Sequence, residues 1–278
     1  MRKVATITLI ALLILIAIGV SIGFIMILNG NIKFNGFKIR FGNSYIKEKA
    51  VDEEYDNTFD RININTTAGD IEIINEDIET IKLVIFNEKE RTTVNTDNNI
   101  LDIDVRSKKC NFFCINPKIA RVKLYIPNNY DKDIKITTQY GDITIEKIEN
   151  TNIDINSNYG DVKINKVNSA KLKLDYGDVK INSINELTAE VNYGDIKIDN
   201  VRDYLDLNCD YGDIKIDKFN LTKDSTIKTD YGDVEIKNIE GIYIDSKTDL
   251  GDNDVNNSDK KSDITLTIKV DYGDIEVN

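Results

Sequence analysis

Histidine and tryptophan are missing from the 278 residues, and proline occurs only twice. The lack of histidine removes the commonest general base and the commonest metal ligand. A basic excess is also lacking, because 48 Asp and Glu stand against 36 Lys and Arg and give a net charge of −12. This balance argues against a nucleic-acid partner, which needs a basic footprint. No phosphate loop, dinucleotide fingerprint or Ser/His/Asp set occurs, so the sequence favours a protein that is not an enzyme.

Cysteine is scarce as well, with three residues in the chain. Cys110 and Cys114 flank Asn-Phe-Phe in an expected loop. They are either two ordinary thiols beside an apolar turn or a small disulfide outside the cell. A metal site is disfavoured there, since no histidine and no second cysteine pair could complete it. The sequence implies no cofactor apart from the Ca²⁺ considered below.

Charge is absent from one long stretch, residues 4–28. At about 1.5 Å per residue a helix of this length exceeds the roughly 30 Å hydrocarbon core. We therefore expect a cytoplasmic tail over 1–3, a single transmembrane anchor over 4–28 and a juxtamembrane linker over 29–59. Basic residues lie on both sides of the segment, but the short tail and the large acidic body favour a C-terminal domain outside the cell membrane. A cleaved signal peptide is the alternative.

Alternating apolar and polar residues begin at Arg61 and predict β-strands. Further strands are expected over 81–86, 100–105 and 120–126, and one short strand over 37–41. Ala68-Gly69-Asp70 has the form of a degenerate turn. No sustained helical period follows residue 29, so the body is predicted to be all-β, with irregular first coils over 60–130.

The main feature of the sequence is the tripeptide Tyr-Gly-Asp, which occurs seven times from Tyr140 to Asp274. A degraded copy, Leu250-Gly251-Asp252, precedes the last one, and the intervals are 19, 17, 17, 18, 20, 19 and 22 residues. A nearly constant period with small insertions is typical of stacked repeats. Residues 131–278 are therefore predicted to form a single-stranded β-solenoid with coils of 17–22 residues.

Each repeat alternates apolar residues on both sides of the tripeptide, but the parity changes across it. A continuous strand would turn its side chains to the wrong face after such a change, so Gly-Asp is expected to be a corner. Glycine accepts φ > 0 and aspartate bonds nearby backbone. The structural corner residues are Gly141, Asp142, Gly160, Asp161, Gly177, Asp178, Gly194, Asp195, Gly212, Asp213, Gly232, Asp233, Gly273 and Asp274.

Two residue types within the repeat have alternative interpretations. Cys209 shares its column with Leu174, Val191 and Val270, which predicts a small buried core residue rather than a reactive thiol. The tyrosines face inward or lie at the corner, where stacked rings bury apolar area. A sugar-binding aromatic stripe is the alternative function for that column.

Charged residues also recur at fixed positions. Acidic or amide residues precede each tyrosine, the motif aspartates follow it, and Lys163, Lys180, Lys197 and Lys215 come two residues later in consecutive coils. Like charges about 5 Å apart repel by roughly 1 kcal/mol in water. Either each aspartate caps corner N–H groups and the lysines neutralise it, or the acidic columns bind Ca²⁺.

An apolar anchor, the strand Arg121-Val-Lys-Leu-Tyr-Ile-Pro127 and repeated Gly-Asp-(Ile/Val)-x-(Ile/Val) units together resemble the LiaG-like putative adhesin family. The resemblance covers about residues 58–278. It implies a membrane-anchored bacterial β-solenoid that faces the surface and acts in adhesion, envelope sensing or scaffolding. The family supplies no catalytic residues. A carbohydrate-active β-helix enzyme is the alternative function, and envelope polysaccharide or a surface protein is the expected partner besides the membrane.

The chain stops at Asn278, just after the second strand of its last copy. Exposed solenoid ends invite edge pairing. End-to-end self-association of the domain is therefore expected, tempered by the charge of Glu276.

Overall fold

The computed structural model describes residues 33–34, 37–38, 44–107 and 118–278. The predicted tail and anchor over 1–28 lie outside these residues, and so do Cys110 and Cys114 with their alternative disulfide. Within the described residues, no helix has the length and apolar character needed to cross a bilayer.

The chain divides into two compact units. In the first, β1 (Lys33–Phe34) pairs with β2 (Phe37–Lys38) in antiparallel fashion. The strand predicted over 37–41 is thus present over its first two residues. The second unit comprises Tyr45–Lys108 and Ile119–Asn278 and carries the features discussed below.

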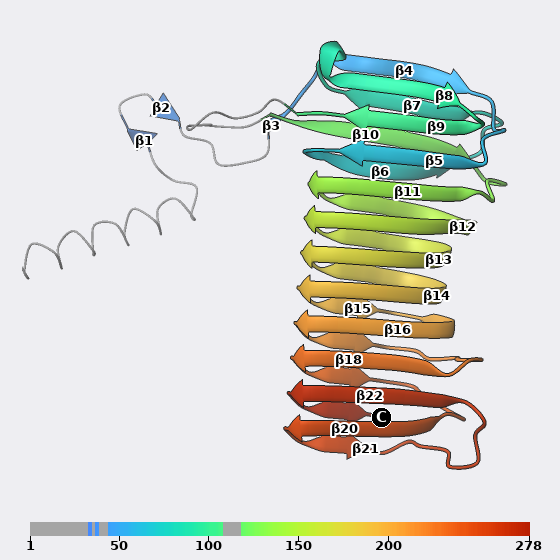
Figure 1. Ribbon diagram of the computed structural model, residues 1–278, viewed down its shortest axis with the longest axis vertical. Helices are drawn as coiled ribbons and strands as arrows, with labels where there is room; N and C mark the ends of the chain where they lie inside the picture. Colours follow the sequence, from blue (N-terminus) through green and yellow to red (C-terminus); the bar gives the residue numbers. More distant parts are fainter. Residues whose placement is uncertain (1–32, 35–36, 39–43, 108–117) are drawn as a thin grey trace, which may run out of the picture. The chain divides into compact units, whose positions relative to one another are not determined.

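The second unit is a stack of strands in two facing layers (Figure 1). The front layer runs through β8 (Thr92–Asp97), β9 (Ile100–Val105), β5 (Arg61–Thr66), β11 (Asp133–Tyr140), the second halves of β12 (Ile143–Tyr159), β13 (Val162–Tyr176) and β14 (Val179–Tyr193), then β16 (Val201–Tyr211), β18 (Ser225–Tyr231), β22 (Thr265–Tyr272) and β20 (Tyr243–Leu250).

The back layer runs through β4 (Lys49–Tyr55), β7 (Ile81–Phe86), β10 (Lys118–Pro127), β6 (Gly69–Glu76), the first halves of β12, β13 and β14, then β15 (Ile196–Ile198), β17 (Ile214–Ile216), β19 (Val234–Ile236), β23 (Ile275–Val277) and β21 (Asn253–Val255). A two-residue strand, β3 (Ser44–Tyr45), and a short 3-10 turn, η1 (Lys89–Arg91), complete the described elements.

Every repeat coil is parallel to its neighbour and in register with it. Tyr140 is aligned with Tyr159, Tyr159 with Tyr176, and Tyr176 with Tyr193. The inward columns fill the space between the layers with buried Ile, Leu and Val side chains, each of which contributes about 1.5–3 kcal/mol on burial. The predicted all-β, solenoid-like fold is confirmed.

The beginning of the stack differs from the repeat coils. β4 pairs antiparallel with β7, β7 with β10, and β8 with β9, so the parallel stacking of the repeats does not extend to these strands. All of them except β4 lie in the span predicted to form irregular first coils, 60–130. Within the linker predicted over 29–59, residues Lys49–Tyr55 form a strand instead. Their acidic residues favoured a linker, yet an edge strand with one open side commonly carries charge.

The end of the stack is out of sequence order. β22 pairs with β18 on one side and with β20 on the other, and β23 lies likewise between β19 and β21. The degraded copy therefore forms the last coil, and the coil that ends at Asn278 is inserted before it (Figure 1). The exposed end assigned to Asn278 is wrong, since β20 and β21 form that end. Self-association of the ends stays a prediction, now for these two strands.

The last coil replaces apolar inward residues by hydroxyls. Its inward positions hold Ser246 and Thr248, where the neighbouring coil has Ile268 and Val270. Thr248 Oγ1 donates to the Gly273 carbonyl at 2.9 Å, and Ser246 Oγ donates to Asn253 Oδ1 at 3.0 Å. A polar end of this kind is what a capping repeat requires.

Candidate functional site

The Tyr-Gly-Asp motifs line one edge of the stack, where the chain passes from the front layer to the back layer. Gly194 has φ +147°, in a region that side chains avoid, and a Cβ added there would lie 2.1 Å from the Gly177 carbonyl oxygen. The same close approach recurs from Gly141 to Gly273. The corner therefore requires glycine for its backbone angle and for its contact with the preceding coil.

The motif aspartates form a continuous hydrogen-bonded ladder. The backbone N–H of Asp213 donates to Asp195 Oδ1 at 2.9 Å, and Asp195 N–H donates to Asp178 Oδ1 at the same distance. Equivalent bonds link the remaining members of the ladder, from Asp70 through Asp142, Asp161, Asp233 and Asp274 to Asp252. Each carboxylate up to Asp274 thus accepts a charge-assisted bond that joins two coils.

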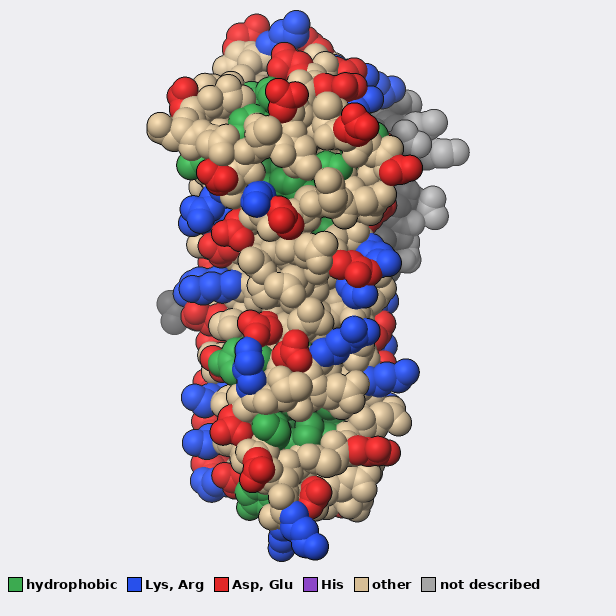
Figure 2. Space-filling model, turned by 90° about the vertical axis from the view of Figure 1, so that its right-hand side faces the viewer, with side chains coloured by type: hydrophobic (Ala, Val, Ile, Leu, Met, Phe, Trp, Pro, Cys, Tyr) green, Lys and Arg blue, Asp and Glu red, His purple; other side chains and the backbone are tan. Residues whose placement is uncertain are grey.

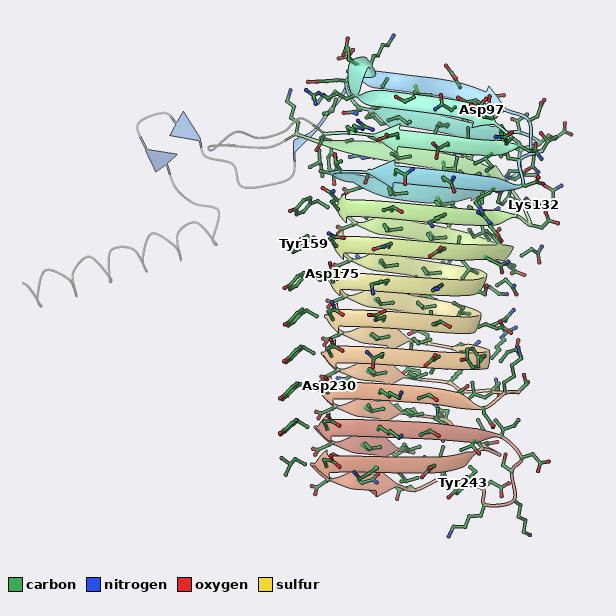
Figure 3. The ribbon with its side chains drawn as sticks, in the orientation of Figure 1. Asp97, Lys132, Tyr159, Asp175, Asp230 and Tyr243 are labelled. Atoms are coloured by element: carbon green, nitrogen blue, oxygen red, sulfur yellow. The ribbon has the colours of Figure 1, made fainter. Side chains whose placement is uncertain are left out.

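The motif tyrosines stack face to face outside the core. The ring centroids lie 4.7–5.0 Å apart with interplanar angles of 1–6°, and Figure 3 shows Tyr159 projecting from this edge. The ladder lies at the corner, not inward, with Tyr193 44% exposed. The ring faces are occupied by neighbouring rings, so only edges and hydroxyls meet solvent. A sugar that stacks on an open face finds no such face inside the ladder.

The charged columns do not neutralise one another at contact distance. Within the part of the chain that the structure describes, no ion pair joins Lys163, Lys180 or Lys197 to a motif aspartate. Instead, partial burial and the neighbouring carboxylates Asp210 and Asp271 raise the pKa of Asp230. Repulsion in the column before the tyrosines is therefore left partly uncompensated.

The acidic residues and Cys209 at this edge are the candidates in the sequence for metal or thiol chemistry. Among the described residues, no group of three or more Cys, Asp and Glu side chains is placed to hold a metal ion. Cys209 is fully buried, as predicted for a core residue. Burial, followed by the neighbouring aspartates, raises the pKa of its thiol to about 12, which keeps it protonated and inert at neutral pH.

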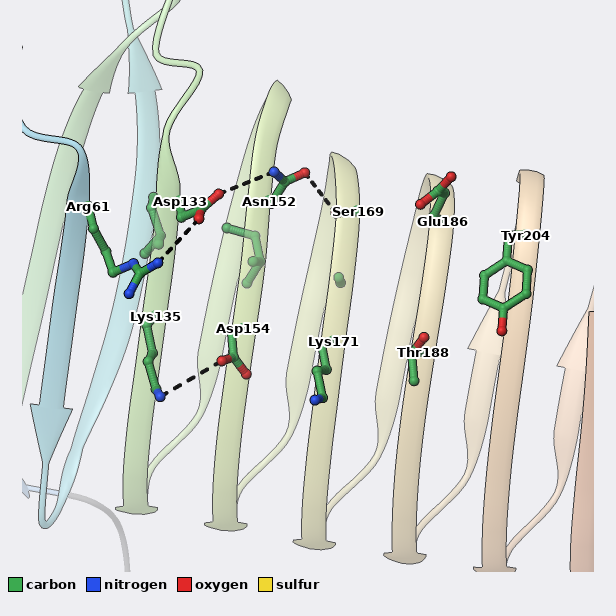
Figure 4. A pocket seen from close by; sticks show the side chains of 13 residues that line it. Arg61, Asp133, Lys135, Asn152, Asp154, Ser169, Lys171, Glu186, Thr188 and Tyr204 are labelled. Carbon is green, nitrogen blue, oxygen red and sulfur yellow. Dashed lines mark hydrogen bonds and ion pairs between the residues drawn. The ribbon is translucent and has the colours of Figure 1, made fainter.

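A groove crosses the outer surface of the front layer, away from the motif edge. It has a volume of about 430 Å³ and extends over β5, β11, β12, β13, β14 and β16 (Figure 4). Its polar side chains occupy two outward columns, which we call the groove residues: Arg61, Asp133, Lys135, Asn152, Asp154, Ser169, Lys171, Glu186, Thr188 and Tyr204. No motif in the sequence marks this site. Its only signal is that these columns differ in residue type from coil to coil while the motif columns repeat.

A chain of polar contacts holds one side of the groove. Arg61 lies 3.6 Å from Asp133, whose Oδ1 accepts a bond from Asn152 Nδ2 at 3.2 Å. Asn152 Oδ1 in turn accepts from Ser169 Oγ at 2.7 Å. Figure 4 shows these partners on successive strands, with the Tyr204 ring seen broadside at the far end. Side chains fixed in this way are ordered before any ligand arrives.

The opposite edge of the stack carries the turns, and its surface charge is mixed. Figure 2 shows acidic and basic side chains interspersed there, with small, scattered hydrophobic patches. Lys132 lies on this side in Figure 3, away from the tyrosine ladder. Mixed surfaces of this kind favour solubility over a single strong electrostatic partner.

One solved structure shares this fold at low sequence identity, and others match it with lower TM-scores. A putative lipid binding protein from Parabacteroides distasonis is 15% identical, with a TM-score of 0.50, and the match covers 86% of this chain and 98% of that one. A putative adhesin from the same species also matches, with 13% identity and a TM-score of 0.42 over 85% of this chain and 100% of that one. A putative adhesin from Bacteroides fragilis matches with 15% identity and a TM-score of 0.40 over 85% of this chain and 100% of that one. None of the curated proteins matches this chain.

The Toastrack DUF4097 family model matches residues 59–278, which contain both the ladder edge and the groove. This span agrees with the resemblance drawn from the repeated Gly-Asp units. The chain therefore belongs to the Toastrack DUF4097 family.

Proposed function

We propose that this protein is a non-enzymatic binding module of the cell envelope, anchored in the membrane by residues 4–28 with its β-domain outside the cell. The domain acts in adhesion, envelope sensing or scaffolding, through the outer faces of its stacked coils. The observation that carries the proposal is the use of the motif carboxylates. Each aspartate from Asp70 to Asp274 accepts an intercoil N–H bond, so the repeated acids serve the scaffold rather than a reaction.

A rigid stack suits such a role for a physical reason. Parallel strands in register hold outward side chains at a fixed spacing of about 4.8 Å along the stack. Repeat proteins use extended surfaces of this kind to bind extended partners. Envelope polysaccharides and surface proteins offer matching extended surfaces.

Co-sedimentation with isolated bacterial envelopes tests the proposal. The full-length chain, in a sugar-free zwitterionic detergent, is mixed with envelopes, and both the bound fraction and the release of reducing ends are measured. Saturable co-sedimentation without release is expected, and the heat-unfolded chain provides the control. Release of reducing ends would support the β-helix enzyme instead, and no co-sedimentation would overturn the proposal.

A further inference from the structure

We propose that the groove residues bind a neutral, extended oligosaccharide along the stack. This inference rests on the proposed binding function and assigns it to one surface. The groove has a volume of about 430 Å³, within the usual range for ligand sites of about 300–1,000 Å³. It crosses strands from β5 to β16, so it is elongated along the stacking direction.

The charge of the groove favours a neutral ligand. Its lining contains three basic residues, Arg61, Lys135 and Lys171, and three acidic ones, Asp133, Asp154 and Glu186. The formal charges cancel, in contrast to the chain as a whole at −12. An anionic polymer would meet three carboxylates, and a cationic one would meet three basic groups. A ligand with hydroxyl groups that both donate and accept hydrogen bonds meets neither penalty.

Hydrogen-bonding groups in the groove are partly ordered and partly free. Asp133, Asn152 and Ser169 hold one another in place, and Lys135 lies 3.9 Å from Asp154. Among the described residues, Lys171 and Thr188 have no side-chain partner. The groove therefore combines fixed donors and acceptors with open ones, and fixed groups reduce the entropy lost on binding.

Tyr204 is an aromatic residue outside the tyrosine ladder. Its neighbour in the same column is Glu186, in register across β14 and β16, and no aromatic ring stacks on it among the described residues. Tyr204 is half-buried, and Figure 4 shows its ring broadside at the end of the groove. Such a ring offers apolar contact area with a polar hydroxyl at its end, which suits the apolar face of a sugar ring.

Calorimetric titration of the full-length chain tests the assignment. The probes are cellohexaose and hexa-N-acetylchitohexaose, with oligogalacturonate as the anionic control and the deacetylated glucosamine hexamer as the cationic control. Binding of a neutral hexamer in preference to both charged ones is expected. Tyr204→Ala should weaken it at least about tenfold, the equivalent of one lost aromatic contact of about 1.4 kcal/mol, whereas Tyr204→Phe should stay within about threefold of wild type.

Tyr243→Ala is the matched control variant. Tyr243 occupies the equivalent position of the last coil, beyond β18 and β22 and outside the groove, so its loss should leave the affinity unchanged. Wild-type affinity in Tyr204→Ala, equal weakening by Tyr243→Ala, preference for a charged hexamer or no binding of either neutral hexamer would each overturn the assignment. If envelopes still co-sediment with the chain in that case, only the groove is refuted and the proposed function stands.

Discussion

The motif edge and the front-layer groove lie on the same coils, yet they differ in how their residues vary. Along the edge, tyrosine, glycine and aspartate recur in every regular coil, and each contacts its own kind in the next coil. Along the groove, the corresponding column reads Asp133, Asn152, Ser169, Glu186 and Tyr204. In a column of identical residues, each side chain contacts the same residue type in the next coil. In a varied column, side chains of different chemistry remain open to solvent.

The comparison separates stability from binding. Substitutions along the edge should lower the free energy of unfolding and leave the groove intact in molecules that remain folded. Substitutions in the groove should lower the affinity for the ligand and leave the stack folded. The predictions below test this separation, beginning with the largest expected effect.

Gly194→Ala should destabilise the fold most. The positive φ costs a side chain about 1–2 kcal/mol, and the Cβ contact of 2.1 Å with a backbone oxygen adds overpacking of about 1–3 kcal/mol. Chemical denaturation should show a loss of about 3 kcal/mol or more. Gly241→Ala is the control, because that glycine has φ +66° with nothing within 4 Å of an added Cβ, and only about 1 kcal/mol should be lost. Equal losses would show that the coil contact is unimportant.

Tyr193→Ala should have the next largest effect on stability. Its ring stacks on Tyr176 at 4.8 Å and on Tyr211 at 4.9 Å. Two aromatic pairs at about 0.5–1.5 kcal/mol each predict a loss of about 1–3 kcal/mol. Thermal unfolding followed by circular dichroism measures it. Tyr243→Ala, whose ring has no stacked partner among the described residues, should cost less than half as much, and the reverse order would contradict a stabilising ladder.

Asp195→Ala removes one step of the aspartate ladder. The Asp213 N–H loses its charge-assisted acceptor, which predicts a loss of about 1–2 kcal/mol in urea denaturation. Asp252→Ala is the matched control. Asp252 donates its N–H to Asp274 Oδ1, but as the last member of the ladder its carboxylate supports no further coil, so a change under about 0.5 kcal/mol is expected. Stabilisation by Asp195→Ala would mean that charge repulsion outweighs the hydrogen bond.

Asp230→Asn should have the smallest effect, and it should be stabilising at neutral pH. The pKa of Asp230 is raised by partial burial and by Asp210 and Asp271. A group whose pKa is higher in the folded state than in the unfolded state stabilises the fold fully below the unfolded pKa, and this stabilisation is lost as pH rises through the folded pKa. The wild-type protein should therefore approach the variant in stability as pH falls toward the ordinary carboxyl range. Melting curves from pH 7 to pH 4 test this, and a constant difference would contradict it.

Much of the fold follows from sequence periodicity. The change of parity at Gly-Asp predicts a corner, and the structure places a positive φ at each motif glycine. The buried Cys209 follows from its column of apolar neighbours. These features are local or repeat from coil to coil, so the pattern within one coil is sufficient to predict them.

Strand order and direction at the two ends of the stack could not be predicted from the sequence, because they depend on which existing strand edge each new strand pairs with. The strands β4, β7 and β10 pair antiparallel, but their apolar and polar residues alternate in the same way as those of the parallel strands. The insertion of β22 between β18 and β20 keeps Tyr272 stacked on Tyr231 at 4.7 Å and leaves Leu250 at the end. Continuity of the tyrosine ladder explains this order, but only after the stacking of the rings is known.

The groove was not predictable for a related reason. Its residues come from separate coils and have no shared motif, so only the register of the strands brings Arg61, Asp133 and Asn152 together. The repeated residues are the conspicuous signal in the sequence. The varied positions within the same repeats are the ones that form the groove.

The most direct test measures unfolding free energy and affinity for a neutral hexasaccharide on the same two variants. Asp195→Ala should lose stability and, while folded, retain wild-type affinity. Tyr204→Ala should stay folded in the conditions of the titration and lose affinity at least about tenfold. Loss of affinity in folded Asp195→Ala, together with wild-type binding by Tyr204→Ala, would contradict the division between a structural edge and a binding groove.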